Sequence, residues 1–435
     1  MEEHHMKTAY INGTILNGTE AMEPVSGMTV ITENELICDI LPSDRPLPDG
    51  CEIVDLKGGW LIPGLINLHV HIPANGKPKK KQTDARKTVK LITSNALTRK
   101  ILEFMYKSYT ANELYSGVTT IRSVGGVESY DSWLRDRILA GKAVGPTILA
   151  GNMAVSVPGG HMAGSLAYEA TTPEEAVAFV DKIAEGKPDL IKLMVTGGVL
   201  DATKPGEPGV LRMQPELVRA ACEEAHRLGY QVAAHVESPE GVRVSLENGV
   251  DTIEHGAKPD DEIIRLFKER GAAHVTTLSP ALPYALFDRS VSHCSEMDQL
   301  NGRVVFEGII ACTKACLENG IPVGLGNDTG CPYITHYDFW RELVYFCKYC
   351  DVTPKFALYS ATLGNARIAR IDNVTGSIEV GKRADMVVCE KNPLDDLTVL
   401  RKPSAVICRG IRYDNPAAKI KKMPEVEREL DKFLN

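Results

Sequence analysis

Two histidines, His69 and His71, are separated by a single residue near the end of the apolar run LINLHVHI. Side chains alternate along a β-strand, so both imidazoles point to the same side if this run is a strand. Imidazole is a common protein ligand of zinc and related ions. A His-x-His pair is a weak signal by itself, but it directs attention to other metal-binding side chains in similar places.

Four further side chains of this kind occur in other short apolar runs. Lys192 lies within DLIKLMVT, His235 and His255 lie near the ends of QVAAHVE and TIEHG, and Asp328 closes IPVGLGND. A lysine in an apolar run carries a desolvation cost that is unusual unless its amine has a chemical role. The repeated placement of polar groups at the ends of apolar runs predicts one shared site.

The residue types favour a site for two metal ions. Four histidines and one aspartate provide more ligands than one tetrahedral ion uses, so we expect two divalent ions, with zinc as the expected metal. A neutral Lys192 amine can add carbon dioxide, and the resulting carbamate has one oxygen for each ion. Two ions that share a water lower its pKa toward about 7, and the bridging hydroxide can attack a carbonyl carbon. Asp328 is then the expected general base and later the general acid.

Candidate substrate-binding residues follow other runs. His161 stands in the glycine-rich segment PGGHMAG, where it could donate to the polarised carbonyl as a catalytic group or bind a substrate carboxylate. Arg212 could clamp a carboxylate with its planar guanidinium. Tyr284 and Arg289 are additional candidates. For each of these four, the alternative is an ordinary loop or surface side chain.

Eight apolar runs alternate with helical segments across residues 59–372, which predicts a (β/α)8 TIM barrel, a fold that typically needs about 250 residues. Such barrels keep their active sites at the C-terminal ends of the strands, where the six candidates fall. PELVRAACEEAHRLG and SPEGVRVSLENG are predicted helices, and both end at glycine. The eight runs are LINLHVHI, GVTTIRSVG, PTILAGNMAVS, DLIKLMVT, QVAAHVE, TIEHG, AHVTTLS and IPVGLGND.

Both ends of the chain have a different pattern, with short strands separated by Gly, Asn and Pro. The N-terminal strands are expected in TAYINGTIL, GMTVITENELICDILP and CEIVDLKGG, and the C-terminal ones in GSIEVGKRADMVVCEKN and SAVICRGIRYD. We expect residues 1–58 and 373–435 to form one composite β-sandwich domain, with the barrel of residues 59–372 inserted between them.

Composition excludes several classes of protein. The 435 residues carry 49 Lys and Arg against 57 Asp and Glu, a net charge of −8, which argues against nucleic-acid binding and a polybasic membrane anchor. No apolar stretch is long enough for a membrane span, and the start lacks a signal-peptide profile. We therefore expect a cytoplasmic protein whose eleven scattered cysteines are reduced, including the Cys347/Cys350 pair. The basic segment at 77–81 is either a solvated loop or a lip beside the active site.

The ordered motifs LIPGLINLHVHI, IKLMVTGG, AAHVES, TIEHG, GLGNDTG and GSIEVGKRADMVVCEKNPLDDL resemble the amidohydrolase superfamily. The resemblance extends over nearly the whole chain and is closest to imidazolonepropionase-like proteins and Xaa-Pro or Xaa-Arg dipeptidases. It implies that His69, His71 and Asp328 hold one metal ion and that His235 and His255 hold the second. A carboxylated Lys192 would bridge them. The resemblance also implies a homo-oligomer.

Two positions depart from the family pattern. Asn67 stands where the family usually has an acidic residue, two positions before the first histidine; this position orients the ligands, and the ligands themselves are present. Met162 replaces the glycine that follows the histidine of a Gly-Gly-His-Gly motif. This second change weakens any transfer of substrate preference from the dipeptidases.

The expected function is hydrolysis of an amide or peptide C–N bond in a small molecule, with a dipeptide or an N-acyl amino acid as substrate. One alternative is a cyclic-amide hydrolase of the imidazolone type, or a deaminase. Another is a non-catalytic scaffold of the same fold. The presence of all six expected ligand residues favours an enzyme over the scaffold.

Overall fold

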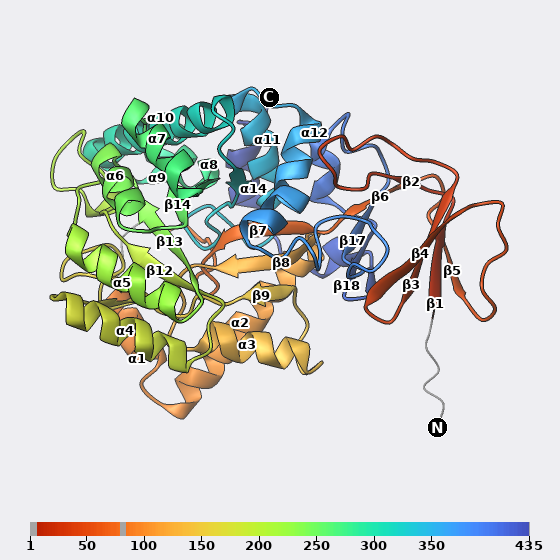
Figure 1. Ribbon diagram of the computed structural model, residues 1–435, viewed down its shortest axis with the longest axis horizontal. Coiled ribbons are helices and arrows are strands. Elements are labelled where there is room, and N and C mark those ends of the chain that lie inside the picture. Colours follow the sequence, from red (N-terminus) through yellow and green to blue (C-terminus); the bar gives the residue numbers. More distant parts are fainter. Residues whose placement is uncertain (1–6, 79–83, 435) are drawn as a thin grey trace.

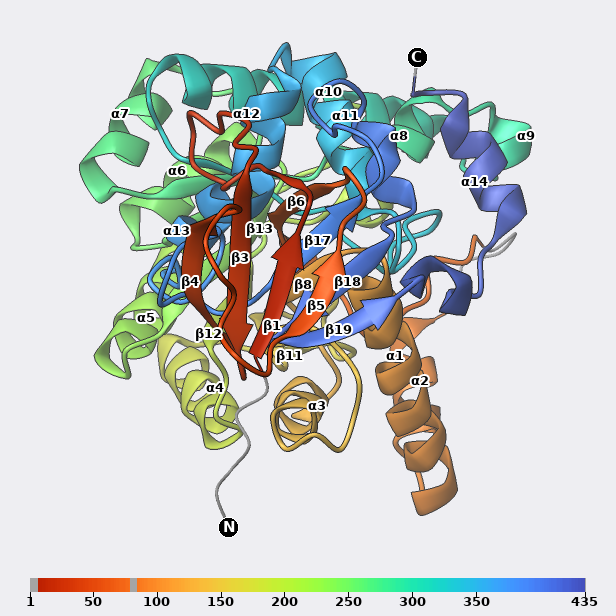
Figure 2. The same ribbon diagram turned by 90° about the vertical axis from the view of Figure 1, so that its right-hand side faces the viewer.

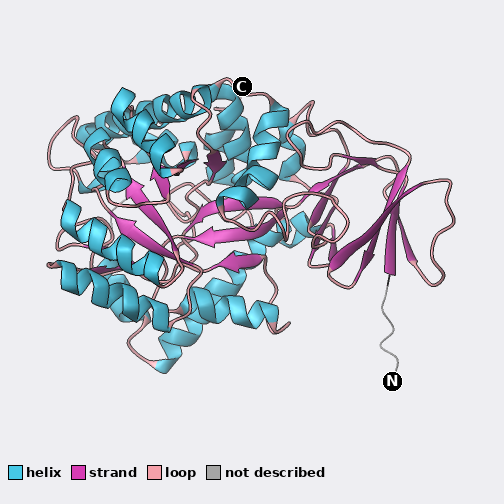
Figure 3. Cartoon of the chain, viewed as in Figure 1, coloured by secondary structure: helices cyan, strands magenta, loops and turns pink. Residues whose placement is uncertain are grey.

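The computed structural model describes residues 7–78 and 84–434. A larger body of strands surrounded by helices lies beside a smaller body made mainly of strands (Figure 1; Figure 3). Three residues of the basic segment at 77–81, namely 79–81, lie outside the described part of the chain.

The larger body contains two parallel sheets. A three-stranded sheet has the order β7-β8-β9, and a seven-stranded sheet has the order β11-β10-β12-β13-β14-β15-β16. These strands are buried and nearly continuously apolar, as expected for parallel strands covered on both faces. Their bounds are β7 (Leu65–Val70), β8 (Val118–Ser123), β9 (Thr147–Leu149), β10 (Ala154–Ser156), β11 (Ala167–Glu169), β12 (Leu190–Met194), β13 (Gln231–Val236), β14 (Thr252–His255), β15 (Ala273–Thr276) and β16 (Val323–Leu325).

The expected barrel is not closed as one continuous ladder of described strands. Its third apolar run divides into β9 and β10, which belong to different sheets. The chain bends between them, where Gly151 packs against the Ser123 carbonyl and Asn152 has a φ of +56°. At the other side, the His71 N–H donates to the Thr329 carbonyl (2.8 Å) and joins the end of β7 to the segment after β16.

Helices alternate with the parallel strands and pack against them (Figure 3). Local signals set their ends: Asp260 caps the start of α7, and Gly271 ends it with a left-handed backbone. The two helices expected from sequence are confirmed as α5 and α6. The helices are α1 (Ala85–Ile92), α2 (Ala96–Tyr115), α3 (Tyr130–Leu139), α4 (Pro173–Glu185), α5 (Pro215–Arg227), α6 (Pro239–Glu247), α7 (Asp261–Arg270), α8 (Leu278–Leu286), α9 (Arg289–Ser292), α10 (Glu296–Glu318), α11 (Phe339–Cys350), α12 (Pro354–Tyr359), α13 (Asn365–Ile368) and α14 (Pro424–Asp431).

The smaller body is built from two more sheets, which face the viewer in Figure 2. One has the order β4-β3-β1-β5 and comes from the N-terminal part alone; the other, β19-β18-β17-β6-β2, combines strands from both ends of the chain. An apolar cluster that includes Tyr10, Ile37, Leu61, Met386 and Ile407 is shared by both ends. The strands are β1 (Lys7–Ile11), β2 (Thr14–Ile15), β3 (Met28–Glu33), β4 (Leu36–Pro42), β5 (Glu52–Asp55), β6 (Trp60–Pro63), β17 (Met386–Cys389), β18 (Ala405–Cys408) and β19 (Ile411–Asp414).

The cysteines of the described chain are all free thiols. On α11, Cys350 is buried and Cys347 is half-buried. Within residues 7–78 and 84–434, none of the helices combines the length and apolar character needed to cross a membrane.

Candidate metal and substrate site

The six predicted ligands meet at the C-terminal ends of the parallel strands. The register pairs Met194 of β12 with His235 of β13, and Val236 with His255 of β14, which brings successive strand ends level with one another. A cavity of about 220 Å³ opens there. Its lining includes the side chains of His71, His161, Lys192, His235, Glu237, His255, Tyr284 and Asp328. His69 is not part of this lining, but its ring centroid lies 4.8 Å from that of His255, which is.

One group of possible ligands surrounds the Asp328 carboxylate. Asp328 Oδ1 lies 3.7 Å from His69 Nε2 and 3.5 Å from His71 Nε2. Ligand atoms of His69, His255 and Asp328 also lie within 4.8 Å of one another. Two imidazole nitrogens and a carboxylate oxygen that converge in this way suit a divalent ion such as zinc.

A second group adjoins the first. Ligand atoms of His235, Glu237 and His255 lie within 4.8 Å of one another. The His235 and His255 rings are 4.6 Å apart, and His255 belongs to both groups. The arrangement therefore has two adjoining groups of possible ligand atoms, and their membership differs from the predicted sets because His255 belongs to both and Glu237 joins the second.

Hydrogen bonds at the outer ring nitrogens orient two of the histidines. The Nδ1 of His69 donates to Glu254 (2.8 Å), and Arg122 donates to the other oxygen of that carboxylate (2.6 Å). The Nδ1 of His71 donates to the Gly125 carbonyl (2.9 Å). These bonds leave Nε2 of both rings without a proton and facing Asp328, which is the state that binds a metal.

His235 and His255, at the ends of β13 and β14, are oriented in a similar way by hydrogen bonds. His235 Nε2 donates to the Gly197 carbonyl (3.2 Å), which leaves Nδ1 as its ligand atom. His255 Nδ1 lies 2.6 Å from the Thr277 hydroxyl, which leaves Nε2 as its ligand atom. Each imidazole therefore has one nitrogen held by the protein and one available for an ion.

Two of the predicted ligands have a left-handed backbone. His255 has a φ of +67° and Asp328 a φ of +54°. A residue with a side chain pays for this conformation with steric strain, and such strain is concentrated at functional sites. At these two positions the turn directs the side chain from the strand end into the cavity.

Burial gives the site its electrostatic character. It lowers the pKa of Lys192 to about 8, so a sizeable fraction of the amine is neutral near neutral pH. Burial also lowers the pKa of His69, His235 and His255 well below the usual value, which keeps the rings neutral. Burial raises the pKa of Asp328, but attraction to the imidazoles of His69 and His71 and to the Lys192 amine outweighs burial and holds this pKa below its ordinary value.

The residues fit a divalent metal. Asp328 Oδ1 is buried without a hydrogen-bond donor among the described residues, although its surroundings favour the charged form. A buried anionic oxygen without a donor is costly unless a cation stands beside it. Asn67, the departure from the family pattern, donates to Asn327 (2.7 Å) and supports the backbone before Asp328.

His161 projects from its loop into the same cavity. Its ring stacks on that of His235, with centroids 4.1 Å apart and planes inclined by 6°. Asp201 accepts a hydrogen bond from His161 Nδ1 (2.5 Å), which fixes the ring and leaves Nε2 as the free nitrogen. The structure therefore places this predicted residue beside the metal ligands.

The other three substrate-binding candidates have different surroundings. Tyr284 lines the cavity, and Gly302 of α10 gives α8 the close approach that brings it there. Arg212 is not among the described residues that line the cavity. Its Nε lies next to Gly197, is buried and has no hydrogen-bond partner among the described residues. Arg289 also lies outside the described lining, because α9 holds it half-exposed, 3.9 Å from Glu296.

Four functional side chains were not singled out from the sequence: Arg122, Asp201, Glu237 and Glu254. Glu237 carried a usable signal, because it follows His235 by two residues and therefore faces the same side. Glu254 is adjacent to His255, so strand alternation alone would have placed it on the opposite side. Its contact with His69 joins side chains of two different sheets, which the spacing along the chain does not reveal.

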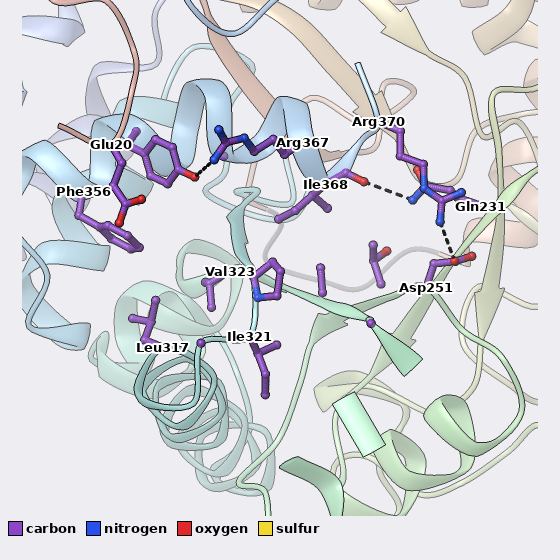
Figure 4. A pocket seen from close by; sticks show the side chains of 17 residues that line it. Glu20, Gln231, Asp251, Leu317, Ile321, Val323, Phe356, Arg367, Ile368 and Arg370 are labelled. Atoms are coloured by element: carbon purple, nitrogen blue, oxygen red, sulfur yellow. Dashed lines mark hydrogen bonds and ion pairs between the residues drawn. The ribbon is translucent and has the colours of Figure 1, made fainter. Parts of the chain in front are cut away.

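A larger cavity, of about 490 Å³, lies at the opposite ends of the strands. Figure 4 shows that its polar groups contact one another: Arg370 pairs with Asp251 (3.2 Å), and Arg367 donates to the Tyr359 hydroxyl (2.8 Å). The middle of the cavity is lined by apolar side chains, including Ile321 and other residues labelled in Figure 4. Its size is greater, but the reactive groups are in the smaller cavity.

Known proteins with solved structures resemble this chain over its full length. A prolidase-like protein from Bifidobacterium longum has a TM-score of 0.87 and 35% identity, with 98% of each chain covered. A Xaa-Pro dipeptidase with methionine bound in its active site has a TM-score of 0.82 and 28% identity, covering 94% of this chain and 100% of the other.

Sequence comparisons agree with this result. Ochratoxinase from Aspergillus niger is 25% identical over 372 residues, which cover 80% of this chain and 73% of the enzyme. The sequence model of the amidohydrolase family matches residues 60–412, a range that contains the parallel sheets and all six predicted ligands. The resemblance seen in the motifs is thus confirmed: the chain belongs to the amidohydrolase family and is a hydrolase that acts on C–N bonds.

Proposed function

We propose that the protein uses two divalent metal ions, with zinc as the expected metal, to hydrolyse an amide bond of a small molecule. The observation that carries this proposal is the convergence of imidazoles, Lys192 and Asp328 on one cavity of about 220 Å³. A cavity of that size suits a dipeptide or an N-acyl amino acid better than a protein chain.

In this proposal, His69, His71 and Asp328 would hold one ion, and His235 and His255 would hold the other. Lys192 would be a further ligand as a carbamate, which forms when the neutral amine adds carbon dioxide and loses a proton and which has two oxygens and a negative charge. The depressed pKa of Lys192, about 8, supports this step, since only the unprotonated amine can react. When bound, such ions supply Lewis acidity and lower the pKa of water.

The side chains of the cavity supply proton transfer and orientation. Asp328 accepts a proton from the attacking water and passes it to the leaving nitrogen, so it acts first as base and then as acid. Protonated His161, paired with Asp201 through Nδ1, donates from Nε2 to the substrate carbonyl oxygen. Tyr284 and Arg212 are proposed contacts for the remainder of the substrate. Arg289 is the weakest of the predicted contacts, because it pairs with Glu296 outside the cavity.

The relatives support a dipeptide as substrate. Two solved structures that match this chain are named for prolidase and Xaa-Pro dipeptidase activity, at 35% and 28% identity. The wider family matches include ochratoxinase and, over 71 residues only, a 5-methylthioadenosine/S-adenosylhomocysteine deaminase. The second of these keeps hydrolysis of a ring, with or without release of ammonia, as the alternative function.

The catalytic unit in this proposal is a (β/α)8 barrel across residues 59–372, and the composite β domain of residues 1–58 and 373–435 accompanies it. The chain passes from β9 through the bend at Gly151 and Asn152 into β10. The order of the strands in the proposed barrel is kept there, although the hydrogen-bonded ladder is interrupted. The apolar cluster shared by both chain ends supports the second unit.

A substrate screen tests the proposed function. Zinc-loaded protein is incubated with dipeptides, N-acyl amino acids and cyclic amides, and the released primary or secondary amine is assayed separately from ammonia. We expect amine release from a dipeptide or an N-acyl amino acid. Ammonia as the only product would establish the alternative, and turnover of none of these compounds would contradict the proposal.

A further inference from the structure

The carboxyl of Glu237 lines the cavity near His235 and His255, and the set of metal ligands proposed above does not use it. It follows His235 by two residues at the end of β13, so both side chains point toward the same side. Its backbone is held in place, because the N–H of Glu237 donates to the Thr196 hydroxyl (3.0 Å) and Gly209 packs directly against its carbonyl.

No cationic side chain of the described protein compensates this carboxyl, and burial together with the nearby Asp328 and Asp201 carboxylates raises its pKa to about 8. Oε2 of Glu237 is buried and has no hydrogen-bond partner among the described residues. Within residues 7–78 and 84–434, it also forms no ion pair with a lysine, arginine or histidine nitrogen at 4.0 Å or less. The charged form is therefore costly while the cavity is empty, and a cation that enters from outside the chain would stabilise it.

The space beside Glu237 is small and lies next to the catalytic groups. Gly198 has no side chain, and a Cβ at that position would lie 3.4 Å from His161 Nδ1 and 3.5 Å from Glu237 Oε2. The missing side chain leaves room between the His161 imidazole, which is proposed to face the substrate carbonyl, and the carboxyl of Glu237. A ligand group that enters this space must be compact, cationic and close to the scissile carbonyl.

The α-ammonium of a dipeptide meets these three conditions. It is a compact cation with three N–H donors, and only one carbon separates it from the scissile carbonyl carbon. An N-acyl amino acid has an apolar group at the same place and would leave Glu237 without a partner. We infer that Glu237 binds the free α-ammonium of the substrate, an inference that rests on the proposed amide hydrolysis. This contact restricts the enzyme to dipeptides with an unblocked amino terminus.

Alanyl and propionyl compounds provide the sharpest test, because they differ only by the ammonium group. The kcat/KM of the zinc-loaded full chain is measured for alanyl amides and propionyl amides of the same amino acids. We expect the wild type to prefer the alanyl compounds at least tenfold. In Glu237→Gln, this preference falls at least tenfold while the kcat/KM for propionyl compounds stays within about threefold. Glu240→Gln, an exposed change on α6, should leave the preference intact.

Metal content and binding separate the remaining interpretations. Glu237→Gln should retain the metal content of the wild type, and loss of an ion would overturn the inference by making Glu237 a metal ligand. Calorimetry with alaninamide and propionamide tests recognition of the ammonium without turnover. Equal binding of the two by the wild type would overturn the inference and leave amide hydrolysis standing, whereas hydrolysis of no amide would contradict only the proposed function.

Discussion

The two ends of the parallel strands hold cavities of opposite character. At the N-terminal ends, about 490 Å³ is bordered by charged groups that contact one another, such as Arg370 and Asp251 (Figure 4). At the C-terminal ends, about 220 Å³ is bordered by carboxylate oxygens of Asp328 and Glu237 that lack a hydrogen-bond donor among the described residues. Polar groups that the protein leaves uncompensated, and not cavity volume, locate the chemistry in this fold.

Matched aspartate changes at the two ends should show the largest difference. Asp328→Asn removes the proposed metal ligand and the proposed proton-transfer group, so kcat/KM should fall by roughly a hundred- to ten-thousand-fold. Asp251→Asn makes the same chemical change at the opposite end and should leave kcat/KM within about twofold of the wild type. Amine release from the best dipeptide measures both. Comparable losses in the two variants would contradict the assignment of the chemistry to one end.

A change at Glu254 tests whether its hydrogen bond with His69 Nδ1 contributes to metal affinity. Glu254→Gln removes the charge that Arg122 and His69 share, so the ring is held less firmly in the metal-binding orientation. We expect metal affinity to weaken by about ten- to a hundredfold, measured by titration of the metal-free protein.

Excess zinc should restore much of the activity of Glu254→Gln, because its catalytic groups are intact. The thermal unfolding temperature of the metal-free variant serves as the control for folding. Unchanged metal affinity would mean that Glu254 stabilises the interior without orienting the ligand.

Asp131 is a buried carboxyl that differs from Glu237 because the protein gives donors to one of its oxygens, Oδ2, although its Oδ1 has none among the described residues. The Ser123 hydroxyl donates to it (2.7 Å), as does the Asn152 N–H (3.0 Å). Burial nevertheless raises its pKa to about 6 from 3.8. The folded state therefore binds this proton more tightly than the unfolded state, and stability is lost as pH rises from about 4 through 6.

The expected loss is about 3 kcal/mol, and Asp131→Asn should abolish it because an amide does not titrate in this range. Urea unfolding of both proteins at pH 4 and pH 7 measures the difference. A constant difference in the free energy of unfolding across this range would show that folding does not shift the pKa of Asp131.

The smallest effect is expected at the N-terminal cavity. Arg370→Ala removes an ion pair between Asp251 and a largely exposed guanidinium, and such pairs contribute little. Activity should not change, and the free energy of unfolding should fall by less than about 1 kcal/mol. A strong loss of activity would show that this cavity contributes to function.

Much of the site could be predicted because metal ligands at strand ends follow simple rules. Alternation along a strand paired His69 with His71, and the placement of Lys192 in an apolar run marked it as unusual. The division of the third run into β9 and β10 was not visible, since the left-handed turn at Asn152 is a tertiary feature. Glu254 escaped notice because its partner, His69, is far away in sequence.

The metal content of the zinc-loaded protein tests the central claim most directly. After reconstitution with zinc and bicarbonate and removal of free metal, we expect two zinc ions per wild-type chain by elemental analysis. Lys192→Ala should hold one or none and lose amide hydrolysis. Two tightly bound ions and full activity in Lys192→Ala, or no bound zinc in the wild type, would contradict the account.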